Sequence, residues 1–290
     1  MTLFVASLVS GLTLGGTFAL IALGLVLAFR ATRTFNFAHG EMMLLGAFIV
    51  GYFQLRHGST AVALLVALSA TAVVGAGFYL LVLRRMTGMS HFMSIIATFG
   101  LAAILDGTMG ILFPALQYTI VLPGVPTSSV HVLGALVSAA SLTLAAFAIA
   151  LAVIVAAIVR FTHLGLMIRA AGQDPLLASQ CGIKVRRLYT GSWAIAGLLA
   201  AVAGITYGSS AIVTTSIDNL GLVAIPAMVL GGMDSVGGAV VGGILVGLMQ
   251  GFVQVYLGGQ YVDVLTYTIL LAALLVYPQG LFGTKEIVRA

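Results

Sequence analysis

The residues best suited to chemistry lie in one polar segment, residues 160–187, within an otherwise apolar chain. This segment carries four Arg, one Lys, one Asp and one His. Asp174 followed by Pro175 indicates a helix start, because an Asp side chain accepts hydrogen bonds from free backbone N–H groups and proline fits the first helical position. Gly182 stands where a left-handed residue would end the helix. The spacing therefore predicts a short, capped surface helix near 176–181.

A helix this short needs a surface to hold it. Leu177 and Cys181, four residues apart, would share one face of it. Lys184 and Arg186 follow its C-terminal end, where positive charge is favoured. Lipid headgroups, the protein's own bundle or a partner protein could hold the helix, so docking of a partner stands beside simple attraction to lipid phosphates.

Composition sets the class of protein in which this segment must work. Hydrophobic residues make up 61% of the chain and charged residues 7%, whereas a soluble domain carries about a quarter charged residues. The first 29 residues contain no charged residue and no His, so they predict a retained span and not a signal peptide. No nucleic-acid partner is expected, because no soluble basic face exists. The single cysteine excludes an internal disulfide.

Spanning a membrane takes roughly 20 apolar residues, and the pattern predicts an all-α, polytopic helix bundle with eight or nine transmembrane helices. The expected helices are 3–29, 40–55, 60–83, 92–113, 134–159, 191–213, 237–256 and 262–282, with a short or broken helix at 218–233. We expect one domain over 1–290 with a cytoplasmic loop at 160–190.

Basic residues orient the bundle, because they favour the cytoplasmic side. An N-terminus outside leaves only Arg56 on the outer side and nine crossings place the C-terminus in the cytoplasm. The basic residues then found inside are Arg30, Arg33, Arg84, Arg85, those of the 160–187 segment, Lys285 and Arg289.

Glycine is the next signal. Six glycines surround Asp234 and Ser235 within 230–243, which predicts a helix break with one of these two residues capping the next helix. Both also stand as candidates for the solute pathway. Glycines four residues apart, at 243, 247 and 251, predict close helix packing within the bundle, the lining of a conduit or a contact between subunits.

A few polar residues lie close to or inside predicted spans. Asn36 is a candidate N-cap of the second helix, and His39 and Glu41 lie just inside it, which predicts a hydrogen-bonded helix start or a gate contact at the cytoplasmic rim. Asp106 lies well inside a span, where a charged group costs about 2.5–3.5 kcal/mol. It could line a polar conduit or bond to hydroxyl groups across a helix interface. Asp218 is expected near the outer end of a span.

The chain lacks a phosphate-binding P-loop, because no Gly precedes Lys184 or Lys285 in the required pattern. His39 and Glu41 do not form the H-E-x-x-H arrangement of zinc sites either. No cofactor or metal is therefore expected in this chain. If the chain moves a solute, the energy must come from another subunit or from an ion gradient.

Three stretches resemble LivH-type permeases of branched-chain amino acid ABC importers. They are TLGGTFALIALGLVLAFRATRTFNFAHGEMMLLGAF at 13–48, RAAGQDPLLASQCGIKVRRLYTGSWAIAGLLAAVAGI at 169–205 and VLGGMDSVGGAVVGGILVG at 229–247. Their order and spacing match that family over nearly the whole chain. The NFAHGE turn and the QDP segment together carry most of the resemblance.

The resemblance implies a non-catalytic permease in a bacterial cytoplasmic (inner) membrane. Two permease subunits, which the resemblance favours as non-identical, would form the pathway. Two ABC ATPase subunits would use the ATP, and an extracytoplasmic binding protein would deliver substrate. ATPase coupling would fall on Arg169, Gln173, Asp174, Pro175, Leu177, Ala178, Gly182, Lys184 and Arg186.

Alternatives remain at this point. Relatives of this family handle urea, amides or other amino acids, and no residue decides among these solutes. An ion-coupled secondary transporter or channel would use Asp106 and need no ATPase. A structural subunit of a membrane enzyme complex would carry no solute at all.

Overall fold

The computed structural model describes residues 2–86, 88–113 and 117–283, and these residues are mostly helical. Seven of the helical segments found there are long and apolar enough to cross a membrane. They contain α1 (Thr2–Thr32), α3 (Thr60–Leu81), α4 (His91–Leu112), α5 (Ala139–Phe161), α8 (Val185–Gly208), α11 (Val236–Tyr256) and α12 (Val262–Val276). Among them lie α2 (His39–Leu55) and a broken element made of α9 (Asn219–Val223) and α10 (Ile225–Gly231). The predicted polytopic helix bundle is confirmed.

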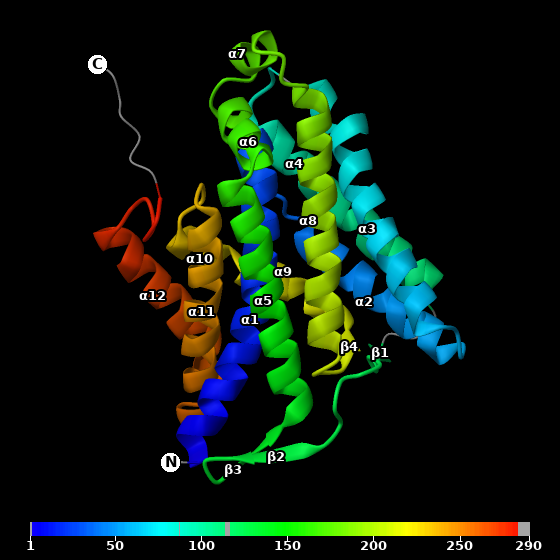
Figure 1. Ribbon diagram of the computed structural model, residues 1–290, viewed down its shortest axis with the longest axis vertical. Helices are drawn as coiled ribbons and strands as arrows, with labels where there is room; N and C mark the ends of the chain where they lie inside the picture. The colour runs from blue at the N-terminus through cyan, green and yellow to red at the C-terminus, as the bar shows by residue number, and fades with distance from the viewer. Residues whose placement is uncertain (1, 87, 114–116, 284–290) are drawn as a thin grey trace.

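Two halves of the chain, α1–α4 and α8–α12, begin with helices of opposite direction. Figure 1 shows α1 and α8 running in opposite directions through the centre of the bundle. Each of these helices leads into a shorter element that starts inside the bundle, α2 after α1 and α9–α10 after α8. The packing is also related, because α1 packs most extensively on α11 and α8 on α3. Inverted halves with interrupted helices are typical of transporters, whose solute sites lie where the halves meet.

Glycines allow the closest of these helix contacts. Gly243, Gly247 and Gly251 on α11 lie directly against the backbone of α1 at Ala19, Gly15 and Gly11. A Cβ atom at any of these three α11 positions would overlap that backbone. These three glycines therefore serve helix packing within the bundle and do not line a conduit.

Short strands occupy the end of the bundle opposite α7 (Pro175–Gln180). A hairpin of β2 (Ser129–Val132) and β3 (Ala135–Ser138) turns at Leu133 and Gly134, both with positive φ. It occupies the start of the helix predicted at 134–159. A second pair joins β1 (Gln117–Tyr118) to β4 (Val213–Thr214).

The other predicted boundaries shift for simple reasons. α12 ends at Val276, six residues before the predicted end, because Pro278 disfavours helical backbone at the residue before it. α8 begins at Val185 and not at 191, since its charged first turn extends beyond the apolar stretch. Lys285 and Arg289, used above for orientation, lie outside the described residues.

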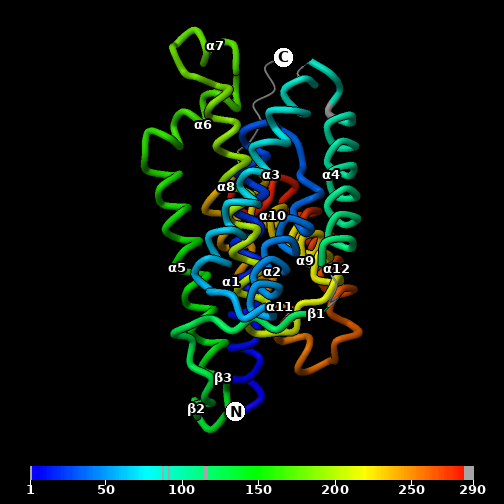
Figure 2. The backbone as a smooth tube through the Cα atoms, turned by 90° about the vertical axis from the view of Figure 1, so that its right-hand side faces the viewer, coloured from blue at the N-terminus to red at the C-terminus, as the bar shows by residue number. Residues whose placement is uncertain are grey.

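Three single-turn 3₁₀ segments and one more helix complete the chain. They are η1 (Leu83–Met86), η2 (Thr215–Asp218), η3 (Gly259–Tyr261) and α6 (His163–Gln173). α6 lies alongside the ends of α1 and α8, and α7 projects beyond it at the same end of the bundle (Figures 1 and 2).

Candidate coupling segment and mid-bundle junction

The helix predicted in the polar segment is confirmed as α7. The Asp174 carboxylate accepts hydrogen bonds from the backbone N–H groups of Leu176 and Leu177, each at 2.9 Å. At the other end Gly182 has φ +83°, and the N–H of Ile183 donates to the carbonyl of Ala178 at 3.1 Å. Both ends are thus closed by local hydrogen bonds, which makes a six-residue helix well defined.

α7 has one exposed face and one anchored face. Leu176 and Leu177 are 68% and 57% exposed, whereas Ala178 is buried. Ala178 belongs to an apolar cluster with Tyr189 and Trp193 of α8 and with residues of α1 and α3. A displacement of α7 would therefore act on three membrane helices at once.

Two hydrogen bonds strengthen this connection. The Tyr189 hydroxyl donates to the carbonyl of Ala171 in α6 at 2.7 Å. The Trp193 indole N–H donates to the hydroxyl of Thr32, the last residue of α1, at 3.3 Å. Together they tie α6, α8 and α1 at the end of the bundle that carries α7.

The candidate coupling and pathway residues partly meet in one charged cavity at this end. A cavity of about 120 Å³ is lined by Arg30, Arg33, Arg169, Gln173, Asp234 and two further residues. Asp234 interacts electrostatically with Arg30. Ser235 caps α11, because its hydroxyl accepts the N–H of Gly238 at 3.0 Å, so the predicted cap is confirmed. Lys184 and Arg186 lie apart from this cavity and are exposed.

The NFAHGE turn lies inside the bundle and not at its rim, so the prediction of a cytoplasmic rim position is wrong. His39 is 1% exposed, and a Cβ on Gly24 of α1 would lie 2.7 Å from its ring carbon Cε1. Gly24 precedes the end of α1 at Thr32 by eight residues, or about 12 Å along the axis. After α1 the chain turns at Arg33, with φ +54°, and returns into the bundle before α2 begins.

Asn36 does not cap α2 as predicted, since the N-cap position is Ala38. The Asn36 side-chain oxygen instead accepts the N–H of Ala38 at 3.2 Å and holds the turn that precedes the helix. His39 makes no hydrogen bond through either ring nitrogen within the described part of the chain. A buried imidazole without hydrogen bonds lowers the stability of the fold, so either close packing or a functional role must account for it.

The starts of α2 and α9 meet at glycines. A Cβ on Gly40 would overlap the carbonyl oxygen of Asp218, and one on Gly221 would lie 2.5 Å from the Cα of Gly40. We call this contact, with the adjoining His39–Gly24 contact, the mid-bundle junction. Asp218 therefore lies beside the start of α2, and the prediction that it lies near the outer end of a span is wrong.

Three carboxylates gather around this junction. Glu41 interacts electrostatically with Asp218 and Asp106, and Asp218 also interacts with Asp106. Asp106 comes from α4, which is held near α2 by stacking of Phe37 on Phe99 at 4.4 Å between ring centroids. Among the described residues no group of three potential ligands is placed to hold a metal ion.

Sequence reasoning named Glu41, Asp106 and Asp218 separately but placed Asp218 at the outer end of a span, so it missed that the three carboxylates lie in one region. The available signal was the pair of interrupted apolar segments, residues 33–55 and 213–231, in corresponding places of the two halves.

Fold and junction together define a polytopic membrane protein with transporter-like inverted halves and a protruding capped helix. The chain belongs to the family described as "Branched-chain amino acid transport system / permease component", whose model matches residues 7–274.

Curated relatives agree with this assignment. The high-affinity branched-chain amino acid transport system permease protein LivH of Escherichia coli K12 is 27% identical, with 98% of this chain and 97% of that protein covered. BraD of Pseudomonas aeruginosa, described in the same words, is also 27% identical with the same coverage. A solved structure of PsaBC from Streptococcus pneumoniae with a Fab matches 97% of this chain and 94% of that chain, at 12% identity and a TM-score of 0.49.

Proposed function

We propose that this chain is the transmembrane permease subunit of an ATP-driven ABC importer for branched-chain amino acids. Membership of the permease family and the names of the curated relatives support this substrate class. Residues 1–290 act as one permease domain in a bacterial cytoplasmic membrane. The distribution of basic residues supports an outer N-terminus and a cytoplasmic C-terminus.

The chain works with partners that supply energy and substrate. Two ABC ATPase subunits bind and hydrolyse ATP, a second, non-identical permease subunit completes the pathway, and an extracytoplasmic binding protein delivers the amino acid. This chain itself catalyses no reaction and holds no cofactor.

The protruding α7 carries the coupling proposal. Its two exposed leucines offer an apolar surface to a cleft on the ATPase, and Arg169, Lys184 and Arg186 offer cations to carboxylates of that partner. The buried Ala178 links α7 to α1, α3 and α8 through one apolar cluster. ATP-driven movement of the ATPase pair would thereby shift α1 and α8, the two helices that bracket the mid-bundle junction.

The proposed wall of the pathway is the side of the bundle that carries the three carboxylates Glu41, Asp106 and Asp218, on or beside α2, α4 and α9. Asp106 and its helical neighbours Gly107 and Gly110 are exposed, and a carboxylate facing lipid is costly. α5 exposes apolar side chains such as Phe147 and Ile154, as α4 also does, but it has no charged residue between 139 and 159. Water and the second permease therefore suit the α4 side, and lipid suits α5.

Coupling is tested with the complete transporter purified through a tag on this chain. Leu177→Arg should abolish co-purification of the ATPase and ATP-dependent leucine uptake into proteoliposomes, with normal membrane levels of the permease. Leu136→Arg is the matched control, because Leu136 is equally exposed but lies on β3 at the opposite end. Retention of the ATPase by Leu177→Arg would refute the coupling role of α7.

The pathway is tested by water access to single cysteines in a Cys181→Ser background. A charged, membrane-impermeant methanethiosulfonate should react faster with Gly107→Cys on α4 than with Ile154→Cys on α5. Equal, slow reaction at both positions would remove α4 from the pathway. Leucine uptake that needs an ion gradient and no ATP would favour the ion-coupled alternative through Asp106.

A further inference from the structure

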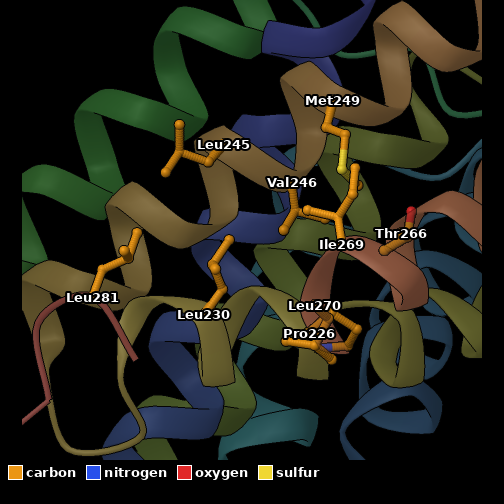
Figure 3. Close-up of a pocket in the computed structure, with 9 residues that line it drawn as sticks. All are labelled: Pro226, Leu230, Leu245, Val246, Met249, Thr266, Ile269, Leu270 and Leu281. Atoms are coloured by element: carbon orange, nitrogen blue, oxygen red, sulfur yellow. The ribbon is translucent and has the colours of Figure 1, made fainter. Parts of the chain in front are cut away.

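An apolar groove of about 300 Å³ lies between α10, α11 and α12. Figure 3 shows Leu230 of α10, Val246 of α11 and Ile269 of α12 converging on it from three helices. Val246 is almost fully buried, whereas Leu245 and Ile269 are 42% and 43% exposed. The groove therefore has a buried floor and a rim that opens on the outside of the bundle.

Among the described residues that line the groove, none offers a free polar group to an occupant. Eight of its nine lining residues are apolar, and Thr266 is the exception. The Thr266 hydroxyl donates to the carbonyl of Val262 at 2.7 Å and accepts from the Gln250 amide at 3.1 Å. A zwitterionic amino acid would lose its hydration here without new hydrogen bonds, which is unfavourable.

α12 is attached to the bundle at two separated places, with the groove between them. The Gln250–Thr266 hydrogen bond holds α12 to α11 near its start. Beyond its end, the backbone N–H groups of Leu281 and Phe282 donate to the carbonyls of Leu230 and Gly231 at 2.8 and 3.1 Å. Between these attachments the helices stand apart, and the groove fills the space.

Its surroundings determine what can occupy it. α11, and α12 together with the preceding turn η3 (Gly259–Val276), meet the length and composition of membrane spans, so the rim opens at the depth of the lipid hydrocarbon. An apolar cavity of about 150 Å³ stays dry and takes up apolar molecules, and this groove is larger. We propose that one acyl chain of a membrane phospholipid occupies the groove as a retained lipid and completes the packing of α12. This inference rests on the membrane crossing of α11 and α12 and not on the proposed solute or its energy source.

The test uses the complete transporter in phosphatidylethanolamine vesicles that contain a phosphatidylcholine with a mid-chain diazirine. One sample is illuminated in the vesicles and a second only after dilution into excess detergent. Mass spectrometry then maps the labelled peptides in each sample. Labelling on α10–α12 peptides should survive the dilution, whereas labelling of the outward face of α5 at Phe147 and Ile154 should disappear. This contrast separates a retained lipid from the lipids that merely surround the protein.

Filling the groove supplies the matched variants. Val246→Phe should reduce the retained label several-fold, and Ile269→Phe, at the more tolerant rim, should do the same if Val246→Phe fails to insert. Val153→Phe on the exposed face of α5 is the control and should leave the label unchanged. The proposal is overturned if groove and α5 labels are lost together, if the filled variants keep the label, or if excess leucine displaces it.

Discussion

The coupling segment and the mid-bundle junction are built in opposite ways. The coupling segment, residues 174–183, is closed by hydrogen bonds between neighbours in sequence and is largely exposed. The junction brings together Gly24, His39, Gly40 and Gly221 from three regions of the chain with almost no free space. The first can change at modest cost to the fold, whereas the second tolerates no added atom. This difference ranks the mutations that follow.

Gly40→Ala should have the largest effect. The new methyl group would overlap the Asp218 carbonyl oxygen, and backbone on both sides leaves no flexible group to move. Overpacking typically costs about 1–3 kcal/mol, and a clash with backbone belongs at the upper end. We expect a strongly reduced yield of folded permease, measured by size-exclusion chromatography after stepwise heating in detergent.

The matched control for this change is Gly77→Ala on α3, where a Cβ would meet nothing within 4 Å. It should leave the heating profile unchanged or slightly improved, because alanine favours helix over glycine. Equal profiles for the two variants would show that the junction is loose and would remove the contrast between the regions.

Gly24→Ala should have the next largest effect, since its methyl group would press on the His39 ring at 2.7 Å. A ring can move slightly, so the loss of stability should be smaller than for Gly40→Ala. His39→Ala should relieve the clash, and the double variant should be more stable than the sum of the single effects predicts. A coupling energy of about 0.5–3 kcal/mol is typical of residues in contact, and additive effects would contradict the proposed packing.

Asp174→Ala should act on function more than on stability. It removes two hydrogen bonds from the start of α7, and loss of such a cap costs about 0.5–2 kcal/mol. We expect less ATPase co-purification and slower leucine uptake with only a small shift of the heating profile, because the lost hydrogen bonds are local to α7. Asp174→Asn keeps the capping oxygen but not the charge, so it should retain most activity. Loss of activity in both variants would assign Asp174 a role through its charge.

The same contrast explains what could be predicted from the sequence. α7 was predictable because Asp174, Pro175 and Gly182 act within one or two turns, and the spans were predictable from apolar length. The position of Asp218 was not predictable, because it depends on a return of the chain into the bundle that only packing against α2 defines. Asn36 failed as a cap for the same reason, since its turn is determined by burial and not by the helix that follows.

Tyr189→Phe should have the smallest effect on stability, and it tests how the coupling segment is connected to the membrane helices. It removes the hydrogen bond from the Tyr189 hydroxyl to the Ala171 carbonyl but keeps the ring. One such bond contributes about 0.5–1.5 kcal/mol, so the permease should fold normally. Because the bond ties α6 to α8, weaker coupling should appear as ATP hydrolysis with reduced leucine uptake per ATP. Thr190→Val, which removes only a hydroxyl bonded within α8, is the control and should keep the ratio. An unchanged ratio in Tyr189→Phe would mean that force passes through the apolar cluster around Ala178 alone.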